Sequence, residues 1–202
     1  AANINLVTPT HYTPSIAAAL GELRDSRALT IPVVYNTSSF DSLEALGLMR
    51  GKVDVYLADF KYASALEAGK LSHAPRYPEI ALAAIEEMVA QVPVWEEDDE
   101  GLLLKGVIVR HLVLPGRVEE SKRALATLHD RFGSGVRLSI MSQYTPLASG
   151  LERYGLAGRV TEEEYEEVLD YADSLGVEDY FWQQGDAAQE SFVPEFNGEG
   201  VR

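Results

Sequence analysis

The chain has 202 residues, 46% of them hydrophobic, which is enough for one compact domain with a substantial core. Its formal net charge of −15 argues against nucleic acid or an anionic membrane surface as a partner, because nothing in it would neutralise phosphates. No apolar run is long enough to span a bilayer, no signal peptide is visible, and the absence of cysteine excludes disulfides. The cytoplasm is the default expectation for the compartment.

The first residues are already typical of a strand. Residue 1 is alanine, not methionine, and the stretch 3–7 reads NINLV. A natural protein rarely begins inside its core sheet, so we expect that a further segment precedes this one.

Strand and helix patterns alternate along the chain, which is the order of parallel βα units. The first half predicts strands at 4–8, 31–35 and 53–57, and helices at 15–25, 41–49 and 77–91. A less regular stretch around Lys70, His73 and Pro75 separates the third strand from the long helix. The second half predicts strands at 106–114, 136–141 and 177–182, and helices at 118–132 and 161–175.

The helix at 161–175 has the clearest boundaries. Thr161 is a suitable N-cap, Glu164 stands three residues later as its capping-box partner, and Gly176 follows the last turn. The acidic run at 96–100 lies between a helix and a strand, and we expect a solvated loop or hairpin tip there, not a metal site.

Five or six strands with intervening helices fit either an open doubly wound sheet or a barrel segment. Periodicity alone does not choose between them. We expect residues 1–182 to form one domain and residues 183–202 to be a loose C-terminal tail.

Polar residues gather at the carboxyl ends of the predicted strands, where parallel α/β folds hold their working residues. Burying an Asp, a Lys and an Arg together in one barrel mouth would cost free energy unless they pair or bind a charged ligand. A ligand with both an ammonium and a carboxylate would suit them. The set comprises residues 8–12, residues 36–39, Asp59, Lys61 and residues 142–144, together with Arg110 and His111, which lie inside the fourth strand.

His11 and His111 are candidate metal ligands, but no HxH or HExxH spacing supports that role, and a hydrogen-bonded structural histidine is the favoured reading of each. His73 and His129 are expected in a loop and on a helix surface. No glycine-rich nucleotide loop and no GxSxG motif occurs.

Three segments carry a resemblance to a known family: VDVYLADFK at 53–61, IVRHLVLPG at 108–116 and SIMSQY at 139–144. Together they resemble the glycyl-radical-enzyme activases, the pyruvate formate-lyase activating enzyme group of radical S-adenosylmethionine (SAM) proteins. The resemblance covers residues 3–146 in the right order. It implies an α/β fold, a partial TIM-like (β/α)6 barrel of parallel strands without its first strand and cluster loop.

The resemblance also implies a binding site. Asp59 and Lys61 would lie near SAM, Arg110 matches a basic residue of the SAM and substrate mouth, and Tyr144 falls near the adenine. His11 would contact the amino or carboxylate end of SAM. A monovalent cation beside SAM would take as ligands Asn36, Thr37, the Leu57 carbonyl and Asp59, although Asn36 replaces an acidic residue. No residue of this chain is assigned a catalytic role.

Two departures from the family stand out. Thr8-Pro9-Thr10-His11 replaces a Gly-Gly-Glu strand end, and Pro9 has no backbone N–H to donate. The Cys-x3-Cys-x2-Cys loop that holds a 4Fe–4S cluster is absent, so this chain alone should be inactive.

For the intact protein, the resemblance implies reductive cleavage of SAM to a 5′-deoxyadenosyl radical. The substrate would be a glycyl radical enzyme or a small molecule, and the electron donor a flavodoxin or ferredoxin. Because the first barrel strand is expected to be missing, we also expect self-association through the exposed sheet edge.

Two other readings stay open. One is a non-catalytic module that binds a small ligand on a degenerate barrel. The other is a metal-dependent lyase or aldolase with Lys61 as a Schiff-base lysine, although Asp59 beside it would keep that amine protonated.

Overall fold

The computed structural model describes residues 1–147, 149–177 and 180–182. Six parallel strands form one sheet in the order β1-β2-β3-β5-β6-β7, and the short β4 pairs antiparallel with β5. The sheet is open, with β1 and β7 at its edges, so the expected partial barrel of parallel strands is confirmed. The parallel strands are β1 (Ile4–Val7), β2 (Val33–Thr37), β3 (Val55–Asp59), β5 (Leu103–Leu112), β6 (Arg137–Met141) and β7 (Tyr180–Trp182).

Strands β2 and β3 end two residues later than predicted. The prediction ends each strand where its apolar run ends. The structure continues the ladder through Asn36, Thr37 and Asp59, which pair with neighbouring strands. Asn36, Thr37 and Asp59 therefore stand on strands and not on the loops after them.

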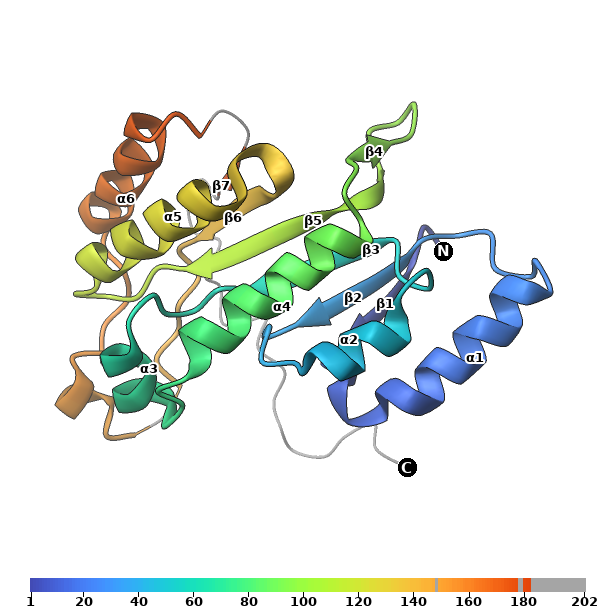
Figure 1. Ribbon diagram of the computed structural model, residues 1–202. Coiled ribbons are helices and arrows are strands. Elements are labelled where there is room, and N and C mark those ends of the chain that lie inside the picture. The colour runs from blue at the N-terminus through green and yellow to red at the C-terminus, as the bar shows by residue number, and fades with distance from the viewer. Residues whose placement is uncertain (148, 178–179, 183–202) are drawn as a thin grey trace.

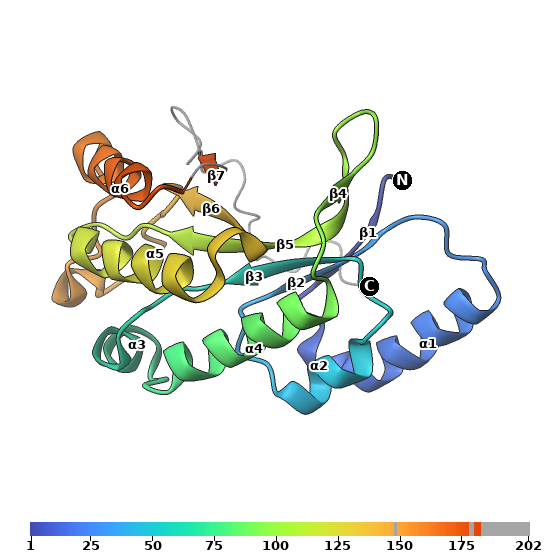
Figure 2. The ribbon, with the colours of Figure 1, turned by 45° about the horizontal axis from the view of Figure 1, so that its top comes forward.

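The helices cover one face of the sheet, as Figure 1 and Figure 2 show for α1, α2, α4 and α5. Helix α3 was not predicted, although Ser64 caps it by accepting from the Glu67 N–H at 3.1 Å. Its short length and central Gly69 hide it from a periodicity reading. The helices are α1 (Thr13–Asp25), α2 (Leu43–Met49), α3 (Ala65–Ser72), α4 (Tyr77–Gln91), α5 (Val118–Phe132) and α6 (Glu162–Ser174), with 3-10 turns at Pro9–Tyr12, Gly133–Gly135 and Leu151–Tyr154.

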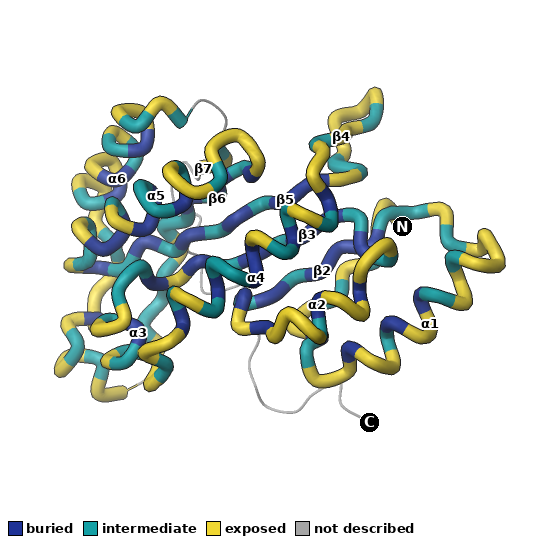
Figure 3. Tube along the Cα trace, in the orientation of Figure 1, coloured by how far each residue is buried: buried dark blue, intermediate teal, exposed yellow. Residues whose placement is uncertain are grey.

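Side chains of the sheet divide between two faces because successive residues of a strand alternate. Tyr35, Tyr56 and Val107 are in register and fully or almost fully buried under the helices. Leu57 and Ile108, also in register, point to the opposite face and are only partly buried. Figure 3 shows the buried residues gathered along the strands and on the sides of the helices that face them. The other face of the sheet is more open to solvent.

The acidic run at 96–100 lies in a hairpin, as predicted. Strand β4 (Glu96–Glu97) pairs with Lys105 and Leu103 of β5, and the hairpin projects away from the side that carries α1, α2 and α4 (Figure 2). Gly106 allows the segment before β4 to pack closely against β5, because a Cβ at position 106 would be 2.6 Å from the Trp95 ring.

The predicted capping box of the last helix is confirmed. The Thr161 side chain accepts from the Glu164 N–H at 3.2 Å, and the Glu164 carboxylate accepts from the Thr161 N–H at 3.0 Å. Gly176 takes a φ of 77° just after the helix, as expected of a C-terminal glycine. The predicted tail at 183–202 lies outside the described residues. In the described part of the chain, no helix is both long and apolar enough to cross a membrane.

Candidate functional site

Four polar side chains meet at the carboxyl edge of the sheet: those of Asn36, Asp59, Lys61 and Arg110, here called the edge cluster. Arg110 Nε and Nη2 lie 2.9 and 2.7 Å from Asp59 Oδ1, and Nη2 also donates to Asn36 Oδ1 at 2.7 Å. Lys61 Nζ donates to the other carboxylate oxygen, Asp59 Oδ2, at 2.7 Å. Of the larger polar set expected at the strand ends, the structure joins these four residues.

The strand register explains why they meet. Asp59 and Arg110 are direct partners on β3 and β5, and Asn36 is the partner of Leu57, two residues before Asp59. Residues in register, or two apart on a strand, point to the same face of a sheet. All three side chains therefore lie on the face opposite the helices, and Lys61 joins them from just beyond β3.

The edge cluster carries two cations for one carboxylate, in a chain whose net charge is −15. The Asp59 and Arg110 side chains are 16% and 24% exposed, whereas Lys61 is 43% exposed. Two of the three ammonium protons of Lys61 remain available after its bond to Asp59. Such an arrangement can accept an anionic group, and a carboxylate or phosphate is the natural partner.

Tyr77 on α4 fixes the backbone under the edge cluster. Its hydroxyl accepts from the Lys61 N–H at 3.0 Å and lies 3.0 and 2.9 Å from the carbonyls of Ser38 and Asp59. Burial raises the pKa of the Tyr77 hydroxyl above its ordinary value, so the group stays neutral. One side chain thus ties the ends of β2 and β3 together. The sequence pattern does not indicate this role, because it predicts Tyr77 only as the start of a helix.

A buried carboxylate, Asp41, organises the neighbouring strand end. It is 2% exposed and accepts hydrogen bonds from Thr10 at 2.8 Å, from Tyr35 at 3.4 Å and from Thr37. These contacts hold the 3-10 turn after β1 against the end of β2. Asp41 was also missed, since its position at the start of a predicted helix gave no sign that it is buried.

Two other residues predicted for the site have contacts or surroundings of their own. His11 is exposed in the turn after β1, and Tyr144 donates to the Leu156 carbonyl at 2.8 Å. In the described ranges, no hydrogen bond joins either side chain to the edge cluster. Their proposed contacts with SAM stay predictions.

His111 is a structural residue, as the favoured reading predicted. It is 2% exposed, Nδ1 lies 2.8 Å from the Phe60 carbonyl, and Nε2 lies 2.9 Å from Ser121 Oγ. Burial lowers the pKa of the imidazole, so the ring is held neutral between two elements. Both nitrogens are used within the fold, which leaves neither for a metal.

The four residues predicted to bind a monovalent cation do not fit one in this arrangement. Asn36 Oδ1 faces the Arg110 guanidinium, and Thr37 donates its hydroxyl proton to Asp41. Asp59 already pairs with two cationic side chains. No group of three or more His, Cys, Asp or Glu side chains suited to a metal occurs among the described residues. The chain has no cysteine to hold an iron–sulfur cluster.

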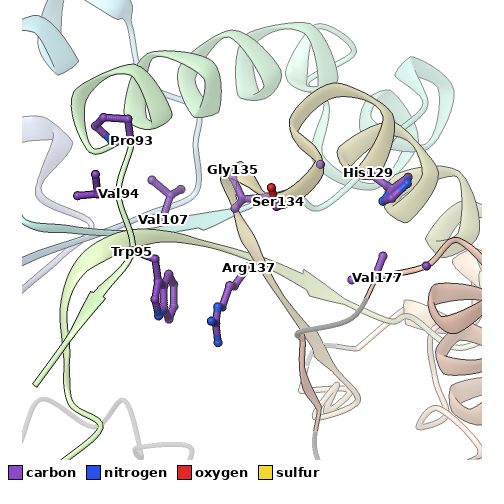
Figure 4. A pocket seen from close by; sticks show the side chains of 12 residues that line it. Pro93, Val94, Trp95, Val107, His129, Ser134, Gly135, Arg137 and Val177 are labelled. Atoms are coloured by element: carbon purple, nitrogen blue, oxygen red, sulfur yellow. The ribbon is translucent and has the colours of Figure 1, made fainter. Parts of the chain in front are cut away.

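A separate hollow of about 330 Å³ lies between the start of β6, the middle of β5 and the segment before β4 (Figure 4). The Arg137 guanidinium lies 4.2 Å from the centroid of the Trp95 ring, in contact with its face. The side chains of His129, Ser134 and Val177 line the hollow in Figure 4. None of the residues predicted for the site lines it.

The sequence is similar to that of a longer protein. The chain is 28% identical over 178 residues to "Uncharacterized protein MJ0674" of Methanocaldococcus jannaschii, covering 87% of this chain and 47% of that protein. It therefore spans about half the length of the curated relative it matches. No protein-family model matches the chain.

Two solved structures share the fold. A domain of pyruvate-formate lyase-activating enzyme from Bacteroides vulgatus superposes with a TM-score of 0.62 at 11% identity, covering 90% of this chain and 98% of that one. A radical SAM methyltransferase from Sphaerobacter thermophilus gives 0.60 at 13% identity, with 91% and 52% covered. The chain therefore shares its open α/β fold with these two structures.

Proposed function

We propose that this chain is the SAM-binding part of a radical SAM protein, and that the edge cluster receives the carboxylate end of SAM. The observation that carries the proposal is the pairing of Lys61 and Arg110 around Asp59 on the open face. Ligands of parallel α/β sheets bind beyond the carboxyl ends of the strands, and the edge cluster stands there.

Each group of the edge cluster has a distinct part in this proposal. Lys61, the more exposed cation, donates to the carboxylate of the ligand. Asp59 holds both cations and keeps the charge of the cluster at one net positive unit. Tyr77 fixes the Lys61 backbone and so the direction from which the ammonium approaches.

SAM bound beside an iron–sulfur cluster supplies one-electron chemistry in radical SAM enzymes. This chain has no cysteine, so the ligands of such a cluster would have to come from another segment of the protein. The chain by itself is proposed to bind SAM without reacting it. A glycyl radical enzyme or a small molecule as substrate, and flavodoxin or ferredoxin as electron donor, belong to the proposed activity of the whole protein.

Calorimetric titration with SAM tests the proposal. Lys61→Met should weaken binding roughly ten- to hundredfold, because a hydrogen bond to a charged group contributes about 1.5–3 kcal/mol. Lys105→Met is the matched control, since Lys105 forms an ion pair with Glu96 in the hairpin and is 46% exposed.

The proposal is wrong if Lys61→Met binds SAM as tightly as the unaltered chain does. A third outcome separates the alternatives. If methionine and simple carboxylates bind as tightly as SAM and the loss in Lys61→Met is the same for all of them, the chain is a general carboxylate-binding module on a degenerate barrel.

A further inference from the structure

The contacts of Arg110 are those that a protein usually gives to a bound cation. Its guanidinium lies between a carboxylate oxygen, Asp59 Oδ1, and an amide oxygen, Asn36 Oδ1, at 2.7 Å from each. Carboxylate and amide oxygens are the ligands that hard cations take in proteins. Here both point at one guanidinium nitrogen, Nη2, from two different strands.

The second carboxylate oxygen is also occupied by a positive group. Lys61 Nζ donates to Asp59 Oδ2 at 2.7 Å, so the two oxygens of one carboxylate each meet a different cation. A metal ion added between Asn36 and Asp59 would be a third positive charge on the same carboxylate. To avoid that, the ion would have to displace the Arg110 guanidinium, which is 24% exposed and fixed by three donor–acceptor contacts.

We propose that the Arg110 guanidinium takes the place of a monovalent cation in this site, so that the site is complete without a metal ion. Arginine stays protonated at every pH at which the protein is folded, so the charge that it supplies is permanent. Lys61 is then the cation that faces a ligand, and Arg110 is a positioning residue that holds Asn36 and Asp59. The inference needs only contacts within the protein and does not assume that SAM is the ligand.

The test is the thermal unfolding of the whole chain in sodium, potassium and tetramethylammonium chloride at equal ionic strength. The unaltered chain should have the same Tm in all three salts. Arg110→Ala frees both oxygens, so its Tm should be lowest in tetramethylammonium chloride. Sodium or potassium should raise it saturably, by about 3–6 °C at ten times the dissociation constant. Should Arg110→Ala not fold, Arg110→Gln removes the charge with less loss of volume and is tested in the same way.

Arg24→Ala is the matched control. Arg24 forms an ion pair with Asp54, just before β3 and so at the opposite end of that strand. Its loss should lower the Tm equally in all three salts. Saturable stabilisation of the unaltered chain by sodium or potassium would overturn the proposal. So would a variant at Arg110 whose Tm does not distinguish the three salts.

A second readout separates this inference from the proposed function. The affinity for SAM should not change when potassium replaces tetramethylammonium. If SAM does not bind at all, the salt dependence of unfolding still decides whether Arg110 acts in place of a cation.

Discussion

The hydroxyl of Tyr77 is the contact on which the shape of the edge cluster depends most. The hydroxyl accepts from the Lys61 N–H and lies within hydrogen-bond distance of the carbonyls of Ser38 and Asp59. Tyr77 itself is only 4% exposed. Tyr77→Phe removes one oxygen atom and leaves these backbone groups without it. A buried polar group left without a partner costs about 1–3 kcal/mol.

That cost translates into a measurable shift. In a domain of this size, each kcal/mol lowers the Tm by about 2–4 °C, so Tyr77→Phe should unfold about 2–12 °C below the unaltered chain. Circular dichroism at 222 nm, a wavelength dominated by helix signal, follows the transition. The variant should also bind SAM more weakly, because the Lys61 backbone is no longer fixed.

Tyr56→Phe is the matched control for this prediction. The Tyr56 hydroxyl donates to Gln91 Oε1 at 2.7 Å, and the residue is fully buried on the helix side of β3. Its loss should lower the Tm by a similar amount and leave the affinity for SAM unchanged. An unaltered Tm in Tyr77→Phe would refute the reasoning, as would an equal loss of affinity in both variants.

Three further predictions concern other parts of the chain. Burial lowers the pKa of His111, so the free energy of unfolding should fall as the pH drops through about 6.5, where the unfolded ring gains a proton, and level off below the folded pKa. Urea unfolding of His111→Gln should lack this pH dependence, and an unchanged dependence would exclude His111 as its source. Gly106→Ala should lower the free energy of unfolding by about 1–3 kcal/mol and change the fluorescence of Trp95, because the new Cβ would meet that ring at 2.6 Å. An unchanged free energy of unfolding would contradict this and show that the ring can move away. The exposed edge of β1, which ends at the 65% exposed Val7, should pair with the same edge of a second copy. Light scattering should therefore show dimers that Val7→Lys disrupts, and a clean monomer at high concentration would contradict this.

Local patterns sufficed for much of the fold. Strands and helices can be recognised by the spacing of their apolar residues, and their regular alternation along the chain predicts parallel βα units. The capping box at Thr161 is a contact between residues three apart, so it can be read without any tertiary information. Strand ends were misplaced at Asn36 and Asp59 because a polar residue in a strand looks like a loop when its face is unknown.

The edge cluster was predictable because the carboxyl ends of parallel strands meet at one edge. Asp59 and Lys61 could be placed there because they follow the predicted third strand, whereas Arg110 stands inside the predicted fourth strand and is placed with them by the resemblance. Tyr77 and Asp41 could not, since one reaches the edge from a helix and the other through a buried network. No local pattern states which face of a helix meets the end of a strand.

The misfit of the expected cation site has a similar origin. Asn36 and Asp59 have the oxygen atoms that such a site needs, and only their contacts with Arg110 show that the place is taken. A list of residue types at strand ends does not contain the distances between side chains from different strands.

The most direct test of the central claim is a crystal structure of the chain with S-adenosylhomocysteine, a stable analogue that keeps the carboxylate of SAM. We expect the carboxylate of the ligand at about 2.7–2.9 Å from Lys61 Nζ, on the open face of the sheet, with Arg110 still joined to Asn36 and Asp59. Density for the ligand elsewhere, for example in the hollow beside Trp95, with the edge cluster unchanged and empty, would contradict the account.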